Sequence, residues 1–376
     1  MKKTICIVIL SRANFARIKS VLIHLRKFDN LNIQIILGGS AILEKYGDVE
    51  KEIKILGYKP YVKLLCVIDG TNLESMTKTV GVLLIEISTV FSKLKPNAVL
   101  TIADRHETIA TAIASRYMNI PLIHTQGGEI TGSVDNSVRD SISMLANYHF
   151  PATALSKKRL ISMGIDKQKI FNFGCPSLDL LLEINFKKKL LNNIMRVGVG
   201  NDINFEKKYL VVLQHPDTDD FASSEKQIKE TLLAISQISM QTIWLWPNVD
   251  AGSDIFSKEL RKFREKQKPN YLHFIKNLPP EIYANLIKHT ECLVGNSSSA
   301  IREGSFLGIP AVNIGSRQRN RELSDNVISV NYNHLQIKKA ILKQMNKKKL
   351  KRNFLYGRGN SGYLISKKIN DILNKK

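Results

Sequence analysis

The first apolar run of the sequence is not followed by the short glycine-rich motif with which many enzymes bind dinucleotides. No Gly-x-Gly-x-x-Gly segment follows the first apolar run, Thr4 to Leu10, where Ser11, Arg12, Ala13 and Asn14 stand instead. A Walker motif is also absent. Because the glycines of these motifs let the backbone approach a diphosphate, their absence counts against a nicotinamide dinucleotide site.

Cysteine and long apolar runs are scarce. The chain has four cysteines in 376 residues, without paired spacing, which predicts buried thiols in a reducing compartment rather than a disulfide framework or a zinc site. No run approaches the roughly 20 apolar residues that cross a bilayer. The apolar part of MKKTICIVIL is only about seven residues long and leads to no small-residue cleavage site, so we interpret it as a first strand. We expect a soluble, cytoplasmic protein.

Acidic and aromatic residues are few beside the basic ones. Lys and Arg number 56 against 33 Asp and Glu, a formal net charge of +23, and such an excess can indicate binding to nucleic acid or to an anionic membrane. The lysine-rich runs, Phe186 to Lys189 and Lys347 to Arg352, lack interleaved aromatics, which make up only 7% of the chain. We therefore expect solvated lysines and no nucleic-acid or membrane partner. The positive potential would instead attract a polyanionic small substrate.

Apolar runs of strand length recur along the chain, with helical segments between them. The first series comprises Thr4 to Leu10, Ile33 to Leu37, Val62 to Val67, Ala98 to Ile102, Leu122 to His124, Tyr148 to Pro151 and Ile170 to Phe173. A Lys- and Asn-rich passage ending near Lys207, interpreted as a linker, precedes the second series: Tyr209 to Leu213, Thr242 to Trp246, Tyr271 to Ile275, Cys292 to Val294 and Ala311 to Ile314. This alternation predicts an α/β fold with two Rossmann-like, doubly wound domains and a cleft between them. The predicted domains are residues 1–185 and 186–355, and an amphipathic helix within residues 356–376, Tyr363 to Leu373, is expected to pack back on the first domain.

Charged residues follow two strands of the first series, at the point where each strand ends. Asp104 comes directly after one strand and before a helix, Thr108 to Tyr117, and Glu129 follows the next strand. Because the carboxyl ends of neighbouring parallel strands face the same crevice, Asp104 and Glu129 should meet there. Asp135 precedes a helix expected from Asn136, so it either caps that helix or joins this group.

His215 also stands at a predicted strand end, in LVVLQHPDTDD. It either hydrogen-bonds its own loop or faces the cleft; metal binding is disfavoured, because no second His or Cys stands at ligand spacing. The convergence of Asp104, Glu129, Asp135 and His215 on one crevice favours acid–base chemistry.

The segment GNSSSAIREGSFLGIP, Gly295 to Pro310, places a glycine and three serines between a strand and a helix expected near Ala300. Backbone N–H groups and hydroxyls at a helix N-terminus suit a phosphate, although the same pattern fits a serine N-cap. Glu303, one turn into that helix, can accept from two ribose hydroxyls or serve as a partner of the helix dipole.

Several longer segments occur in the order seen in one enzyme family: SRANFARIK, ADRHET, HTQGGEITGSVDNSVRD, FGCPSLD, LQHPDTD, WPNVDAGS, VGNSSSAIREGSFLGIPAVNIGSRQ and YGRGNS. In these segments the chain resembles the UDP-N-acetylglucosamine 2-epimerases, above all the hydrolysing branch that supplies N-acetylmannosamine for sialic and related nonulosonic acids. The resemblance implies two Rossmann-like domains in a glycosyltransferase-B-like arrangement, a UDP-sugar in the cleft, and neither metal nor other cofactor.

The resemblance also implies roles for single residues. Ser297 and Ser298 would hold the diphosphate and Glu303 the ribose. The nucleotide-sugar site would also contain Arg12, Arg105, Asn248 and Arg317. The acid–base set would be Asp104, Glu129, Asp135 and His215, and which of these is base and which acid stays open. In the family's chemistry a base removes the proton at C2, UDP leaves from C1 by anti elimination, and water adds to the glycal to give the 2-epimer as a free sugar.

The chain departs from the family pattern at three positions. Asp140 follows Arg139 where the family commonly has Arg-His, which puts the sugar specificity or the rate in doubt. Ala16 stands where some hydrolysing members carry Ser, and Arg358 stands where many members have Asp.

The favoured hypothesis is a hydrolysing 2-epimerase that converts UDP-N-acetylglucosamine to N-acetylmannosamine and UDP. The first alternative is the same reaction on UDP-2,4-diacetamido-2,4,6-trideoxyglucose. The others are a non-hydrolysing epimerase, a glycosyltransferase of the same fold, and a basic nucleic-acid binder. By analogy with the family we expect a homo-oligomer, with a dimer as the default.

Overall fold

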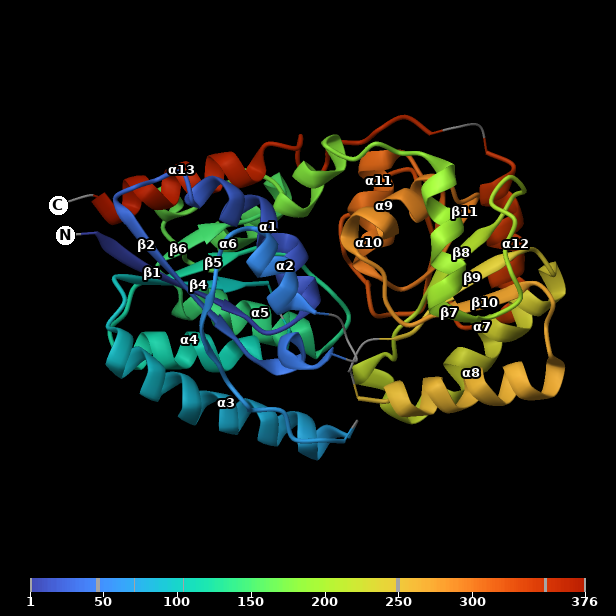
Figure 1. The fold of residues 1–376 in the computed structure, drawn as a ribbon, viewed down its shortest axis with the longest axis horizontal. Helices are drawn as coiled ribbons and strands as arrows, with labels where there is room; N and C mark the ends of the chain where they lie inside the picture. Colours follow the sequence, from blue (N-terminus) through green and yellow to red (C-terminus); the bar gives the residue numbers. More distant parts are fainter. Residues whose placement is uncertain are drawn as a thin grey trace. The chain divides into compact units, whose positions relative to one another are not determined.

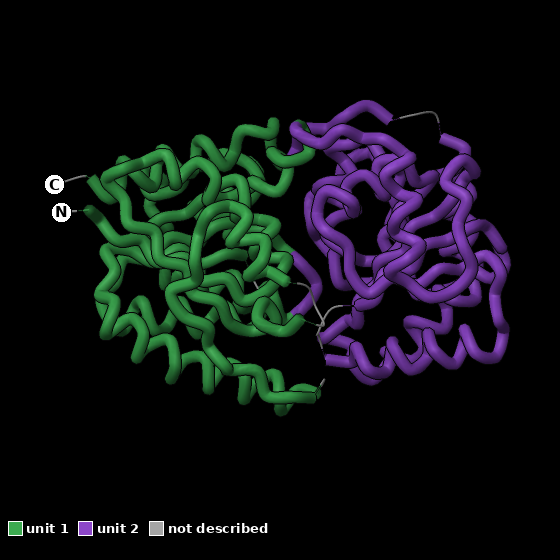
Figure 2. The backbone as a smooth tube through the Cα atoms, in the orientation of Figure 1, with its two compact units in different colours: residues 1–130, 134–182, 356–376 green, residues 131–133, 183–355 purple. Residues whose placement is uncertain are grey.

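The chain folds into two compact units (Figure 2). Each unit is built on one sheet. The computed structural model describes residues 2–44, 48–70, 72–103, 105–247, 251–347 and 350–374. Unit 1 comprises Met1–Ile130, Val134–Leu182 and Tyr356–Lys376, and unit 2 comprises Thr131–Ser133 and Glu183–Leu355. Unit 1 is therefore discontinuous in sequence.

Unit 1 has a six-stranded parallel sheet in the order β3-β2-β1-β4-β5-β6 (Figure 1). Its strands are β1 Lys3–Ile9, β2 Leu31–Leu37, β3 Pro60–Lys63, β4 Ala98–Ile102, β5 Leu122–Thr125 and β6 Tyr148–Phe150. Its helices are α1 Arg12–Leu25, η1 Gly39–Ile42, α2 Val49–Ile55, α3 Leu73–Leu94, α4 Thr108–Tyr117, α5 Val134–Leu145, α6 Ala154–Ser162, η3 Lys167–Lys169, η4 Pro176–Leu182 and α13 Ser361–Asn374. The strand order reverses between β1 and β4, which is the position where doubly wound sheets bind ligands.

Unit 2 has a seven-stranded sheet in the order β13-β12-β11-β8-β9-β10-β7, parallel except for β7. Its strands are β7 Gly198–Gly200, β8 Leu210–Leu213, β9 Thr242–Leu245, β10 Leu272–Ile275, β11 Cys292–Gly295, β12 Ala311–Ile314 and β13 Val327–Val330. Its helices are η5 Lys188–Val197, η6 Thr218–Ser223, α7 Ser224–Ile238, α8 Ser253–Gln267, α9 Pro280–Lys288, α10 Ser298–Ile301, α11 Glu303–Leu307 and α12 His334–Met345.

The predicted order of strands and connections needs three corrections. The strand predicted at Val62 to Val67 is β3, Pro60–Lys63, which begins and ends earlier. The run Ile170 to Phe173 is not a strand: it makes one isolated bridge, between His149 and Ile170, and its two phenylalanines pack against Phe150 in the core. The Lys- and Asn-rich passage before Lys207 is not a linker, because it forms η5 and β7 of unit 2.

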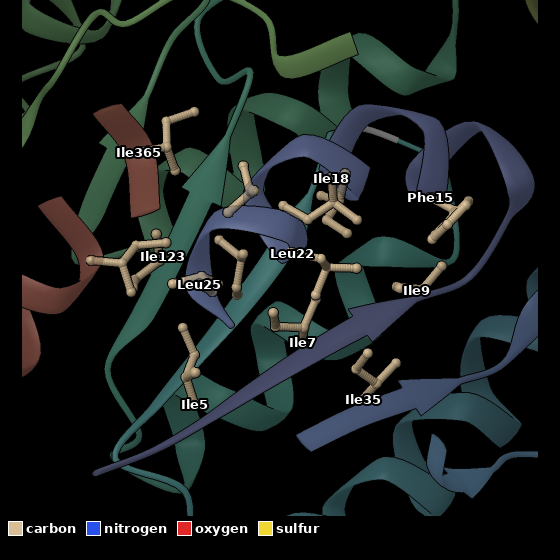
Figure 3. Packing of buried hydrophobic residues seen from close by; sticks show 14 of the residues in the cluster. Ile5, Ile7, Ile9, Phe15, Ile18, Leu22, Leu25, Ile35, Ile123 and Ile365 are labelled. Atoms are coloured by element: carbon tan, nitrogen blue, oxygen red, sulfur yellow. The ribbon is translucent and has the colours of Figure 1, made fainter. Parts of the chain in front are cut away.

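The core of unit 1 explains why the sequence of β1 is a continuous apolar run. One face of the strand buries Ile5, Ile7 and Ile9 against α1 and α13 (Figure 3). The other face buries Cys6 and Val8 in a second cluster with α3 and α4. A central strand that is covered on both faces does not alternate between apolar and polar residues. Each buried aliphatic side chain contributes about 1.5–3 kcal/mol to the free energy of unfolding.

Helix α13 packs on α1, far from it in sequence (Figure 1). The buried Asp179 carboxylate accepts from the N–H groups of Ser361 and Gly362, at 3.0 and 2.6 Å, and from Ser20 Oγ at 2.7 Å. Gly362 has no room for a side chain, because a Cβ there would lie 2.1 Å from Ser20 Oγ. The beginning of α13 is thus fastened to η4 and α1 of the same unit.

Among the described residues, α3 has the length and composition of a membrane span, with a mean hydropathy of 1.2, which the sequence analysis did not anticipate. Only 28% of the 18-residue segment with this hydropathy is buried. The buried residues recur every four positions, at Ser75, Thr79, Leu83, Ile87 and Phe91, and thus form one stripe. Length and composition alone are weak evidence, and this stripe is typical of a helix that packs on one side.

A buried histidine predicts how unit 1 responds to acid. Burial, and to a smaller extent the neighbouring His124, lower the pKa of His149 from 6.5 to about 3. Between these two values the unfolded chain binds a proton that the folded chain does not, so stability falls as the pH drops below 6.5. We expect unit 1 to lose about 2 kcal/mol between pH 7 and pH 5 from this group.

The measurement is amide hydrogen exchange of β5 and β6 at the two pH values, because both tryptophans, Trp244 and Trp246, lie in unit 2. His149→Phe should remove this part of the pH dependence. An unchanged dependence in the variant would contradict the assignment to His149.

Candidate active site

The two strand ends that carry the predicted carboxylates lie side by side in unit 1. Strands β4 and β5 pair in register, and the residue after each strand, Ala103 and Gln126, has a left-handed φ of 59° and 63°. Such a conformation is strained in a non-glycine residue and is often found at functional sites. His124 Nε2 donates to Ala103 O at 3.0 Å, which holds the first of these turns. Asp104 follows this turn but lies outside the described residues, so its meeting with Glu129 stays a prediction.

Glu129 is buried in a tightly held loop. Its carbonyl oxygen accepts from Arg139 Nη1 at 2.6 Å and from Arg159 Nη1 at 3.2 Å. The preceding Gly128 has a φ of 80°, and a Cβ there would lie 2.3 Å from Ser156 O, so α6 packs directly on the loop. The main chain at Glu129 therefore has little freedom.

One interpretation of the sequence made Asp135 the cap of α5, and this interpretation is wrong. The helix begins at Val134, two residues earlier than predicted, so Asp135 lies in its first turn. There a carboxylate is favourably placed toward the helix dipole. Asp135 and Glu129 belong to the same unit.

Two arginines of the predicted site lie at the switch point of the unit 1 sheet. Arg12 is the first residue of α1, directly after β1, and Ser11 caps this helix by accepting from Asn14 N–H. Asn14 Nδ2 in turn donates to Ile102 O at the end of β4. Arg105 follows β4, so both arginines follow strands at the carboxyl edge of the sheet, as does the loop that contains Glu129.

Glu107 is a further candidate residue that the sequence analysis did not single out. Its buried carboxylate accepts from Arg105 Nε at 2.8 Å and lies 3.1 Å from His106 Nδ1. Burial acts to raise the pKa of Glu107, but the charges of Arg105 and His106 outweigh it and hold the pKa below its usual value. Glu107 thus stays ionised and orients Arg105. The motif ADRHET contained the signal, an acid two residues after an arginine at a strand end.

In unit 2, His215 is fixed by a residue from the neighbouring strand end. Asn296 Oδ1 accepts from His215 N–H at 2.7 Å, and Asn296 Nδ2 donates to His215 O at 2.8 Å. Asn296 O itself accepts from Gln318 Nε2 at 2.9 Å. All three residues are buried. His215 therefore leaves β8 in one fixed main-chain conformation.

The serine segment after β11 differs from the prediction of one helix near Ala300. Two short helices, α10 and α11, meet at Arg302, and Ser297 caps the first by accepting from Ser299 N–H. Ser297 and Ser298 remain partly exposed. Because α10 has four residues, its dipole is weak, and a phosphate here would depend mainly on hydroxyl and N–H donors.

The loop after β12 carries Arg317. Its carbonyl accepts from Gly132 N–H at 3.1 Å, and Thr131–Ser133 therefore belong to unit 2. Gly132 has no room for a side chain, because a Cβ would lie 2.1 Å from Ser316 O. Ser316 Oγ donates to Asp217, a buried carboxyl whose pKa is raised by burial.

The predicted residues thus divide between the two units. Unit 1 contains Arg12, Arg105, Glu129 and Asp135, and unit 2 contains His215, Ser297, Ser298, Glu303 and Arg317. Asp104 and Asn248 lie outside the described residues. In both units the described candidates lie on segments that follow strand ends, but their roles stay predictions.

A family model described as UDP-N-acetylglucosamine 2-epimerase matches residues 23–372. The chain belongs to this epimerase family. It is 33% identical to a UDP-N,N'-diacetylbacillosamine 2-epimerase (hydrolyzing) of Legionella pneumophila over 378 residues, 97% of this chain and 96% of that one. It is 29% identical to a GDP/UDP-N,N'-diacetylbacillosamine 2-epimerase (hydrolyzing) of Campylobacter jejuni over 341 residues, 89% and 86% of the two chains.

Members of the epimerase family also share the fold. The crystal structure of the UDP-GlcNAc 2-epimerase of Methanocaldococcus jannaschii, in complex with UDP-GlcNAc and UDP, superposes with a TM-score of 0.81 at 21% identity, over 99% of this chain and 100% of that one. This likeness confirms the predicted α/β fold class of two Rossmann-like domains of glycosyltransferase-B type. Membership of the epimerase family makes the reaction the 2-epimerisation of a UDP-sugar.

Proposed function

We propose that this UDP-sugar 2-epimerase is hydrolysing and that its substrate is UDP-N,N'-diacetylbacillosamine, the 2,4-diacetamido-2,4,6-trideoxy sugar. The observation that carries the proposal is the match over 97% of the chain to the hydrolysing enzyme of that name from Legionella pneumophila. The products would be UDP and the free 2-epimer. The sequence analysis left this sugar open beside UDP-N-acetylglucosamine, which remains the second candidate because the family model carries its name.

The chemistry requires two half-reactions at neighbouring carbons. A carboxylate of unit 1 would accept the C2 proton, the C–H electrons would form the C1=C2 double bond, and the C1–O bond would break with release of UDP. Water would then add across the double bond, its oxygen to C1 and a proton to C2 on the opposite face. Glu129 and Asp135 are the described carboxylates predicted for these proton transfers, together with Asp104.

The groups predicted to bind UDP suit a leaving diphosphate. Arg317 would offset the negative charge that develops on UDP, and the partly exposed Ser297 and Ser298 offer hydroxyl donors. Glu303 begins α11, where it would accept from the ribose hydroxyls.

The test is to incubate the protein with each UDP-sugar in deuterated water and to identify the products by NMR. We expect release of UDP together with a 2-epimer that carries deuterium at C2, and a preference of more than tenfold in kcat/KM for the diacetamido sugar. Epimerised UDP-sugar without free UDP would show a non-hydrolysing enzyme. A preference for UDP-N-acetylglucosamine would reverse the order of the two substrates.

A further inference from the structure

An ion pair between α5 and α6 is hydrogen-bonded to the main chain of the Glu129 loop. Arg159 on α6 donates to Asp140 on α5 with both ends of its guanidinium group, Nη1 to Oδ1 at 2.7 Å and Nη2 to Oδ2 at 2.5 Å. Arg159 Nη1 also donates to the Glu129 carbonyl at 3.2 Å. Asn136 Nδ2 donates to Asp140 at 3.3 Å and supports the carboxylate from the same helix. One guanidinium group therefore joins a carboxylate to the main chain of a predicted catalytic residue.

The Glu129 carbonyl accepts from two arginines at once. Arg139, which is fully buried, donates from α5 at 2.6 Å, and Arg159 donates from α6. A carbonyl oxygen has two lone pairs, so both are engaged, and bonds from charged donors are about twice as strong as neutral ones. The loop is thus held by one helix on each side.

This arrangement brings two positive charges to a single oxygen. Like charges so close repel one another, and Asp140 supplies the negative charge that offsets the repulsion. The rigid fork of an arginine can bond a carboxylate with two N–H groups while its orientation is fixed. Asp140 therefore both neutralises Arg159 and directs its Nη1 toward the Glu129 carbonyl.

We propose that Asp140 and Arg159 are positioning residues that fix the Glu129 main chain, and through it the Glu129 carboxylate, for proton transfer at C2 of the sugar. The proposal rests on the proposed function, in which Glu129 belongs to the acid–base set. It gives a structural role to the position at which the family commonly has histidine. A histidine there could not accept the two parallel N–H bonds that Arg159 makes with Asp140.

The first variant is Asp140→Asn, which keeps the size of the side chain and removes its charge. We expect kcat to fall about 10–100-fold, because small displacements of a catalytic group are costly. KM and the Kd of UDP should change less than threefold, because the residues predicted to hold the diphosphate and the ribose, Ser297, Ser298 and Glu303, lie in unit 2. Glu74→Gln is the matched control: it removes the charge of an exposed unit 1 pair with Lys78, and kcat should stay within twofold.

The charge-swapped double variant, Asp140→Arg with Arg159→Asp, separates positioning from stability. It can restore an ion pair between α5 and α6, but an aspartate at position 159 cannot donate to the Glu129 carbonyl. We expect thermal stability to recover while kcat stays low. Full recovery of kcat would overturn the proposal and leave a purely structural ion pair.

Hydrogen exchange of the loop amides, residues 126–130, tests the proposal without any substrate. Exchange should accelerate in Asp140→Asn and stay unchanged in Glu74→Gln. Unchanged exchange in Asp140→Asn would overturn the positioning role even if the wild-type protein is an active epimerase. Conversely, wild-type protein that converts neither UDP-sugar would refute the proposed function, while the exchange result would still decide whether the pair fixes the loop.

Discussion

Replacing Glu129 by glutamine is expected to lower kcat about 10²–10⁴-fold, the range that general acid–base catalysis contributes. The substitution is nearly isosteric, and the loop should keep its conformation because Arg139 and Arg159 bond the main chain of Glu129 rather than its side chain. What is lost is the oxygen that can accept or deliver a proton. The rate of UDP release and the Kd of UDP, measured by calorimetry, should separate loss of chemistry from loss of binding.

The Kd of UDP should change less than twofold in Glu129→Gln, because the residues predicted to hold the diphosphate and the ribose lie in unit 2. Deuterium incorporation at C2 of recovered substrate should fall together with kcat if Glu129 handles the C2 proton. A kcat within tenfold of wild type would remove Glu129 from the acid–base set and leave Asp104 and Asp135 as its members.

Replacing Asn296 by alanine is expected to lower kcat about 100-fold, because His215 would no longer be held in place. The substitution would leave the buried N–H and C=O of His215 without their partner, which we expect to cost about 2–6 kcal/mol at 1–3 kcal/mol for each group. Trp244 and Trp246 lie in unit 2, so tryptophan fluorescence during urea unfolding reports this loss of stability directly.

Asn285→Ala is the matched control for Asn296→Ala. Asn285 is a buried amide of the same unit that donates to Lys187 O at 2.8 Å, on α9 rather than at a strand end. The Asn285→Ala variant should be less stable than the wild type but keep its kcat. If Asn296→Ala is destabilised and yet retains wild-type kcat, its bonds to His215 serve folding alone. Asn296→Asp should resemble the alanine variant, because a carboxylate oxygen would face the His215 carbonyl.

The central strands of both sheets could be predicted because burial on two faces leaves long apolar runs. Edge strands are harder: β7 has three residues and two of them are exposed, so it carries no apolar run. The wrong prediction of a strand at Ile170 to Phe173 is the opposite case, an apolar run that does not form a strand. These residues are apolar because Phe171 and Phe173 pack on the core beside Phe150, not because they pair in the sheet.

Candidate site residues could be predicted where they stand at strand ends, because parallel sheets collect these ends along one edge. Glu129 and His215 were predicted as candidates in this way. The residues that hold them could not be predicted. Asn296 and Arg159 bond main-chain atoms of residues 81 and 30 positions away, and no local sequence pattern indicates such a bond.

The return of α13 to unit 1 determines the order in which the chain can fold on the ribosome. Residues 183–355, all of unit 2 but three residues, are translated between η4 and α13. At about 5–20 residues per second, this takes roughly 10–35 s. During that interval α1 has no α13 to cover it, and the Asp179 carboxylate has neither of the N–H partners that α13 provides. Unit 1 is begun first by the ribosome and is completed last.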